Sequence, residues 1–207
     1  MITARSLVVA TQNQGKLREL REMLADLPFQ LYGLTDFPDI DQVPETGKTF
    51  IENASLKAVG YAMQTGCLAL ADDSGLEVDA LGGAPGVLSA RYAGESASDA
   101  ERIEKLLLEL SINPAMKRSA RFVSAVAIAD GGGRILDVSI GECNGRIDFA
   151  PRGSKGFGYD PIFIPNGYDK TFAELKTEIK NEISHRAHAL LGAREFLRTL
   201  TIASGGG

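Results

Sequence analysis

The stretch ALADDSGLEVDAL, residues 69–81, places two adjacent carboxylates, Asp72 and Asp73, directly after an apolar run. The segment CLALAD (67–72) has the length and composition of a buried strand. We therefore expect both carboxylates at the C-terminal end of a strand, where open α/β sheets place their ligands. Two like charges repel each other there unless a cation or an added proton relieves the charge.

The segments before this strand predict a strand and two helices. SLVVAT (6–11) is typical of a short buried strand, and KLRELREMLADL (16–27) carries leucines on one helical face. In TFIENASLKAVGYAMQTG (49–66), Thr49 and Glu52 have the spacing of a capping box, which predicts where a second helix begins.

The segments after it predict a third helix, a hairpin and a last helix. Ser98 and Glu101 form a second capping box at the start of the third helix. Two strand-length runs flank three glycines and predict a long antiparallel hairpin, which a further strand would follow. Ser184 would be the N-cap of the last helix. In order, these segments are 98–110, 120–130, 134–143, 145–150 and 184–200.

The length and composition predict one soluble domain. With 207 residues, 44% apolar and 24% charged, the chain can bury a full core. No repeat and no linker stands out, so we expect residues 1–207 to form a single domain. The expected class is α/β, with a mixed twisted sheet flanked by helices and two lobes with a cleft between them. Residues 204–207 are expected to be a flexible tail.

Charge and cysteine content exclude several function classes. The formal net charge is −5 without any run of Lys or Arg, which argues against binding nucleic acid or an anionic membrane through bulk charge. Cys67 and Cys143 form no Cys-x-x-Cys pair, so we expect neither a zinc site nor a disulfide framework. No apolar run is long enough for a signal-peptide core or a membrane span, so a cytoplasmic location is expected.

The segment VVATQNQGKLRE (8–19) predicts a strand that turns directly into a helix N-terminus. Backbone N–H groups and the helix dipole attract anions at such a place, and Lys16 adds a positive charge. The loop is not a P-loop, because Ala10 and Leu17 replace the first glycine and the magnesium-binding Ser or Thr. An ordinary strand–helix turn with a surface lysine would explain the same residues.

The acidic pair suits a hard cation. Mg²⁺ prefers carboxylate oxygens together with water and substrate phosphates. Glu45, in the loop before the second helix, would complete such a site. The alternative is that Asp73 caps a turn with Ser74 and Gly75 while Asp72 is solvated.

The segment GSKGFGYDPIF (153–163) offers groups that suit a purine base. Its glycines let the backbone approach a ligand, and Phe157 and Tyr159 offer flat faces. Asp160 would accept hydrogen bonds from ring N–H groups. Alternatively, Phe157 is a core residue and Asp160, before Pro161, belongs to a turn.

The segment IKNEISHRAHAL (179–190) offers donors near a helix start. Lys180, His185 and Arg186 would donate to a carbonyl or a phosphate. A structural role for His185 is the alternative.

Together and in this order, these segments closely resemble the inosine and xanthosine triphosphate pyrophosphatase family, whose members hydrolyse deaminated purine nucleoside triphosphates. The resemblance extends over nearly the whole chain, and its longest run is far more specific than any four-residue motif. It is carried by Thr-x-Asn-x-Gly-Lys at 11–16, FIENA at 50–54, ADDSGLEVDALGGAPGVLSARYAG at 71–94, GFGYDPIF at 156–163 and SHR at 184–186.

The resemblance implies a reaction and a role for each matching residue. ITP, dITP or XTP and water would give the monophosphate and pyrophosphate, with Mg²⁺ as cofactor, and the protein would be a homodimer. The triphosphate would be bound by Thr11, Gln12, Asn13, Gln14, Gly15, Lys16 and Lys57. Mg²⁺ would be bound by Glu45, Asp72 and Asp73, and Asp73 would also accept the proton. The base and the rest of the nucleotide would be bound by Ser74, Phe157, Gly158, Tyr159, Asp160, Lys180, His185 and Arg186.

Two other function classes would use the same features. A Mg²⁺-dependent phosphatase of another substrate type would release inorganic phosphate, and a non-catalytic nucleotide sensor would bind without turnover. Product analysis separates the first from a pyrophosphatase, and turnover separates the second.

Overall fold

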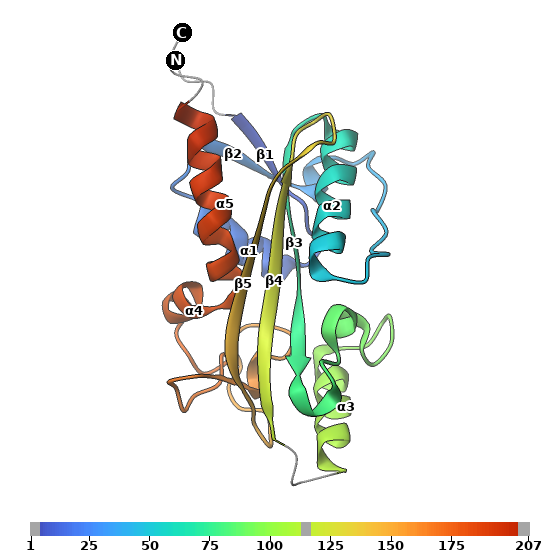
Figure 1. Ribbon diagram of the computed structural model, residues 1–207, viewed down its shortest axis with the longest axis vertical. Coiled ribbons are helices and arrows are strands. Elements are labelled where there is room, and N and C mark those ends of the chain that lie inside the picture. Colours follow the sequence, from blue (N-terminus) through green and yellow to red (C-terminus); the bar gives the residue numbers. More distant parts are fainter. Residues whose placement is uncertain (1–4, 113–116, 203–207) are drawn as a thin grey trace. The chain divides into compact units, whose positions relative to one another are not determined.

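The computed structural model describes residues 5–112 and 117–202, so the predicted tail at 204–207 lies outside the described residues. Six strands form a mixed sheet in the order β2-β1-β3-β4-β5-β6, with helices beside it (Figure 1). The predicted α/β class with a mixed sheet is therefore confirmed. The elements are β1 (Arg5–Val9), α1 (Gln14–Leu24), β2 (Phe29–Gly33), α2 (Phe50–Thr65), β3 (Leu68–Val78), α3 (Asp99–Ser111), β4 (Ser119–Ala129), β5 (Ile135–Ile147), β6 (Phe163–Pro165), α4 (Thr177–Ile183) and α5 (His185–Ile202).

The described chain forms two compact units. Unit 1 contains residues 5–73, 124–141 and 186–202, and unit 2 contains 74–123 and 142–185 with the gap noted above. Strands β3, β4 and β5 each contribute residues to both units. The cleft expected between two lobes stays a prediction.

Unit 1 is built on parallel strand pairs. β1 pairs in parallel with β2, Leu7 opposite Leu31, and with β3, Leu7 opposite Leu68. Its core is filled by α1 and α5, whose buried residues recur at helical spacing; these are Leu17, Leu20 and Leu24 in α1 and Ala189, Leu190, Ala193 and Leu197 in α5. Helix α2 lies on the other side of β3 (Figure 1). Two helices therefore pack on one face of β3 and a third helix on the other.

Unit 2 is built on antiparallel pairing. β5 pairs with β6, Gly145 opposite Pro165. Beside this pairing, Ile147 N donates to Arg118 O at 2.8 Å, as the predicted hairpin of β4 and β5 requires. The core contains a cluster of aromatic rings, in which the ring centres of Phe122 and Phe163 lie 4.7 Å apart.

The acidic pair lies elsewhere in its strand than predicted. β3 does not end at Asp72 but continues to Val78, so both carboxylates lie inside an 11-residue strand. The strand continues because Leu76 and Val78 are fully buried in the core of unit 2. The polar residues interrupt the apolar run without interrupting the strand.

Four other elements differ from the prediction, and one of them is β6, whose three residues were not predicted to form a strand. β2 and α4 were not predicted, because β2 has only its first and last residues buried and the seven residues of α4 bury only Lys180. The separate strand expected at 145–150 is the end of β5, which runs to Ile147. The capping boxes at Thr49 and Ser98 are confirmed.

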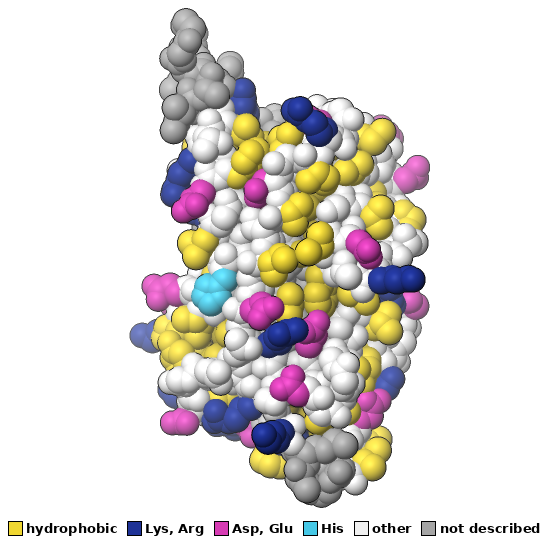
Figure 2. All heavy atoms as spheres, viewed as in Figure 1, with side chains coloured by type: hydrophobic (Ala, Val, Ile, Leu, Met, Phe, Trp, Pro, Cys, Tyr) yellow, Lys and Arg dark blue, Asp and Glu magenta, His cyan; other side chains and the backbone are white. Residues whose placement is uncertain are grey.

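The surface carries charges of both signs. On the face seen in Figure 2, Lys and Arg side chains are interspersed with Asp and Glu. Among the helices of residues 5–112 and 117–202, none has the length and apolar character needed to cross a membrane.

Candidate active site

Asp72 and Asp73 belong to two different charge clusters. Successive side chains of a strand point to opposite faces of the sheet. Asp72 accordingly meets Lys16 from α1, with Oδ2 at 2.8 Å from Lys16 Nζ. Asp73 meets Lys57 from α2, with Oδ1 at 2.8 Å from Lys57 Nζ. Each carboxylate has its own lysine, so the repulsion expected from their adjacency is relieved within the fold.

The Asp72 cluster consists of Asp72, Lys16, Ser124, Arg186 and Glu19, and it is almost closed to solvent. Ser124 Oγ donates to Asp72 Oδ1 at 2.5 Å, and Arg186 Nη2 lies 3.4 Å from Asp72 Oδ2. Arg186 Nη1 donates to Glu19 Oε2 at 2.5 Å, and the Arg186 side chain is 1% exposed. Arg186 is thereby held between the carboxylates of Glu19 and Asp72, whose negative charges compensate its buried positive charge.

The pKa values of Asp72 and Lys16 are both lowered, but for different reasons. Burial alone would raise the pKa of Asp72, but Arg186 and Lys16 outweigh it and hold that pKa well below its usual range. Burial lowers the pKa of Lys16, although Asp72 opposes the shift. Asp72 therefore stays a carboxylate that anchors Lys16. Its role as a Mg²⁺ ligand, expected from the resemblance, stays a prediction; both of its oxygens are engaged within the protein and it is fully buried.

The turn before α1 fixes the backbone that leads to Lys16. Asn13 is the N-cap, and its Oδ1 accepts from Lys16 N at 3.0 Å. Thr11 Oγ1 accepts from Asn13 N at 3.2 Å. Thr11, Gln12 and Gln14 border a hollow of about 310 Å³ that also touches Phe37 and Tyr61. The predicted phosphate loop is therefore an ordered helix start beside open space, with Gly15 in its first turn.

Glu19 is a site residue that the sequence analysis missed. It is 6% exposed although it is charged, because it pairs with Arg186, 167 residues further along the chain. Its position three residues after Lys16 places both side chains on one face of α1. That spacing is the only sequence feature that points to it.

The Asp73 cluster consists of Asp73, Lys57 and Glu45. Lys57 Nζ lies 2.8 Å from Glu45 Oε1 and 2.8 Å from Asp73 Oδ1, so both carboxylates converge on one point. Burial raises the pKa of Asp73, and the charges of Lys57 and Lys16 only partly oppose it. Burial would lower the pKa of Lys57, but Asp73 and Glu45 raise it above its usual value. Asp73 is thus the carboxylate of the pair that more readily accepts a proton.

The Asp73 cluster fits a magnesium ion. Within residues 5–112 and 117–202, no three His, Cys, Asp or Glu side chains are arranged to hold a metal. However, Mg²⁺ typically takes one or two protein carboxylates and completes its shell with water and substrate phosphates. Glu45 and Asp73 supply such a pair, since their oxygens already share one cationic partner.

Unit 2 brings together the residues predicted to bind a base. Residues 156–160, called the base loop below, fold around Asp160, whose Oδ2 accepts from Phe157 N at 2.9 Å. Lys180 Nζ lies 2.5 Å from the same oxygen and 4.9 Å from the centre of the Phe157 ring. Phe157 is partly exposed, whereas Asp160 and Lys180 are buried. A ring face, an acceptor and an ammonium group therefore meet in one place.

The expected roles of Tyr159 and Arg186 in binding the nucleotide stay predictions. Tyr159 is 4% exposed in the core of unit 2, and its hydroxyl donates to Ser89 O at 3.0 Å. Arg186, expected to act with Lys180 and His185, lies beside the carboxylates of Glu19 and Asp72 in unit 1. The His185 ring stacks on the Phe122 ring in the core of unit 2, with 4.6 Å between the ring centres.

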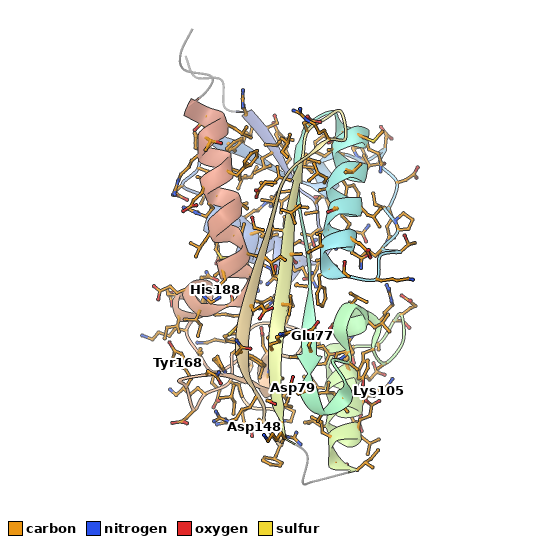
Figure 3. The ribbon with its side chains drawn as sticks, in the orientation of Figure 1. Glu77, Asp79, Lys105, Asp148, Tyr168 and His188 are labelled. Carbon is orange, nitrogen blue, oxygen red and sulfur yellow. The ribbon has the colours of Figure 1, made fainter. Side chains whose placement is uncertain are left out.

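Other charged groups lie outside these clusters. Glu77 on β3 pairs with Arg121 at 2.8 Å, and Asp79 lies just beyond the end of that strand (Figure 3). His188 is exposed on α5, in contrast to the buried His185. Ser74, next to Asp73, is partly buried.

Comparison with known proteins identifies the family of this chain. The model of the Ham1 family matches residues 7–196. The chain belongs to the Ham1 family. Its Ham1 relatives include proteins named dITP/XTP pyrophosphatase, so the resemblance found in the sequence is confirmed.

Two such relatives come from Geobacter sulfurreducens and Geobacillus kaustophilus. The first is 52% identical over 191 residues, which are 92% of this chain and 96% of the relative. The second is 52% identical over 186 residues, 90% of this chain and 91% of the relative. Solved Ham1 structures agree with the fold. The Staphylococcus aureus Ham1 protein has a TM-score of 0.82 at 42% identity, covering 94% of this chain and 99% of its own. A HAM1 protein from Coxiella burnetii has a TM-score of 0.81 at 43% identity, covering 98% and 100%.

Proposed function

We propose that this protein hydrolyses the deaminated purine nucleoside triphosphates ITP, dITP and XTP to the monophosphate and pyrophosphate, which cleanses the nucleotide pool. The observation that carries the proposal is the division of the acidic pair into two lysine–carboxylate clusters on β3. One cluster presents a fixed cation, and the other presents a carboxylate with a raised pKa. Relatives at about half identity named dITP/XTP pyrophosphatase support the substrate class.

In this proposal the Asp72 cluster serves the triphosphate. Asp72 and Arg186 are buried and keep Lys16 in place at the start of α1. Lys16 and the N-terminal dipole of the helix stabilise negative charge on the leaving pyrophosphate, which is the main contribution a protein makes to phosphoryl transfer. Thr11, Gln12, Asn13, Gln14 and Gly15 shape the loop around it.

The Asp73 cluster serves the attacking water. Glu45 and Asp73 would hold Mg²⁺, with Lys57 beside them. When bound, Mg²⁺ offsets phosphate charge and makes a nearby water more acidic. Asp73 accepts the proton of the water that attacks the α-phosphorus, and its raised pKa suits that task.

The base loop would select the purine. Phe157 stacks on the ring, Asp160 accepts from a ring N–H, and Lys180 donates to the 6-oxo group, with Gly158 and His185 nearby. The 6-amino group of adenine is itself a donor and would leave buried donors unpaired. Such a mismatch can reject a substrate by a factor on the order of 10⁴.

We further propose that the protein is a homodimer of the cytoplasm, as the family resemblance implies. Its mass in solution, measured by light scattering, tests the dimer directly.

The test of the function is the identity of the phosphate product. Purified protein is incubated with ITP, XTP, ATP or GTP, with and without added inorganic pyrophosphatase. We expect ITP and XTP to give monophosphate and pyrophosphate much faster than ATP and GTP. Turnover should stop with EDTA and return with excess Mg²⁺. Direct release of orthophosphate would indicate a phosphatase, and binding without turnover would indicate a nucleotide sensor.

A further inference from the structure

Asp99, the first residue of α3, is bonded to the base loop. Its Oδ2 accepts from Gly158 N at 2.6 Å, across 59 residues of sequence. Its other oxygen, Oδ1, accepts from Arg102 Nη1 at 2.7 Å, and Arg102 Nη2 donates to Ala97 O at 2.5 Å. The carboxylate is therefore held on one side by its own helix and on the other by the loop.

The bond fixes one of the two peptide groups that flank Phe157. Gly158 N belongs to the peptide that follows Phe157, and Phe157 N belongs to the peptide that precedes it. Asp99 holds the first of these N–H groups, and Asp160 holds the second at 2.9 Å. Because both peptide groups are held, the backbone dihedrals of Phe157 are restricted, and with them the direction in which its Cα–Cβ bond leaves the backbone.

Asp99 is not needed to cap its own helix. Ser98 Oγ accepts from Glu101 N at 3.3 Å, and Glu101 Oε2 accepts from Ser98 N at 2.7 Å, which completes a capping box. A hollow of about 670 Å³ borders Asp99 together with Gly153 and Pro161, two residues outside the base loop.

We infer that Asp99 is a positioning residue that sets the orientation of the Phe157 ring and thereby the selection of the purine. The inference rests on the function proposed above, because it assigns Asp99 to the base site of that function. Asp99 acts through Gly158 and touches no substrate. Loss of its carboxylate frees the peptide after Phe157, so the ring stacks less often in the binding orientation.

The test compares Asp99→Ala with Asp99→Asn and with Glu104→Ala. Asp99→Ala removes the acceptor, Asp99→Asn keeps an acceptor oxygen, and Glu104→Ala removes the same charge from an exposed position of the same helix. For Asp99→Ala we expect KM for ITP to rise about tenfold, as loss of one charge-assisted hydrogen bond predicts, with kcat within about threefold. The preference for ITP over ATP should fall. In Asp99→Asn, KM for ITP and the preference for ITP over ATP should stay close to the wild-type values. Both quantities should equal those of the wild type in Glu104→Ala.

Several outcomes would overturn the inference. An Asp99→Ala enzyme with wild-type KM and selectivity would do so, as would equal losses in Asp99→Ala and Asp99→Asn. If Asp99→Ala does not fold, the comparison of Asp99→Asn with Glu104→Ala decides, since Asp99→Asn should stay within about threefold of wild-type KM. If the wild type itself does not prefer ITP to ATP, the proposed function fails, and that result is visible before any variant is measured.

Discussion

The Asp73 carboxylate lies where a proton acceptor and a metal ligand would be needed, beside Lys57 and Glu45. Asp73→Asn keeps the shape of the side chain but removes its basicity and one ligand charge. We predict a fall in kcat of at least ~10² with nucleotide affinity largely kept, because the Lys16 loop is untouched. Steady-state kinetics with ITP and equilibrium binding of ITP measure the two effects. Near-normal kcat would remove Asp73 from the mechanism.

Asp72 should matter for stability as well as for activity. Its folded pKa is depressed by Arg186 and Lys16 against the effect of burial. Its charge therefore stabilises the fold fully above the unfolded pKa of about 4, and this contribution is lost as pH falls toward the folded pKa.

We predict that Asp72→Asn lowers the free energy of unfolding at neutral pH by about 3 kcal/mol, because it leaves buried cations uncompensated. The difference from wild type should shrink below about pH 4, because Asp72 of the unfolded wild type takes up a proton there, whereas Asp72 of the folded protein does so only at a lower pH. Urea unfolding of the wild type and of Asp72→Asn over a pH series measures this difference in the free energy of unfolding. A difference that is constant from pH 7 to the acid range contradicts the assignment.

At this scale the sequence predicted some site residues and missed others. Lys16, Asp73 and Asp160 were recognisable because each lies in a local motif with a distinctive spacing. Glu19 and Ser124 were not, because their partners Arg186 and Asp72 lie 167 and 52 residues away. Tyr159 was assigned an open face because its sequence position does not reveal that its ring is buried.

At the scale of elements, the base loop depends on a glycine with restricted surroundings. Gly156 has φ +75°, and a Cβ there would overlap with Asp160 Oδ2. Gly158 has φ +61°, but a Cβ would meet nothing within 4 Å. A side chain at either position would strain the backbone, but only a side chain at 156 would also overlap with a neighbouring atom.

We predict that Gly156→Ala lowers the free energy of unfolding by about 3 kcal/mol, whereas Gly158→Ala costs about 1 kcal/mol from strain alone. Chemical denaturation of the two variants beside the wild type provides the comparison. Equal losses would mean that the contact between Gly156 and Asp160 does not constrain the loop.

The elements themselves were predictable where caps and periodic leucines coincide, as in α2 and α3. β3 was predicted too short because Asp72, Asp73 and Ser74 end an apolar run, although the buried Leu76 and Val78 extend the strand. α4 was missed because it has only seven residues, and its apolar pair, Ile179 and Ile183, is too short a pattern to indicate a helix. The polar residues lie inside this strand, whereas local sequence patterns treat them as its end.

At the scale of the whole molecule, the net charge of −5 opposes binding of a polyanionic nucleotide. Unit 1 meets that problem locally by gathering Lys16, Lys57 and Arg186 around β3. Unit 2 contributes one ammonium group, Lys180, beneath the Phe157 ring face. Phosphate chemistry and base selection are thus assigned to different parts of one chain. The order of strand and helix patterns predicted the α/β class, and the family resemblance implied this division of tasks.

The most direct test of the account is to hydrolyse ITP in water labelled with heavy oxygen and to determine the mass of both products. If water is activated beside Asp73 and attacks the α-phosphorus, the label appears in the monophosphate and the pyrophosphate stays unlabelled. Label in the pyrophosphate, or release of labelled orthophosphate, would contradict the account, because the bond broken would then not be the one that the two clusters on β3 are proposed to act on.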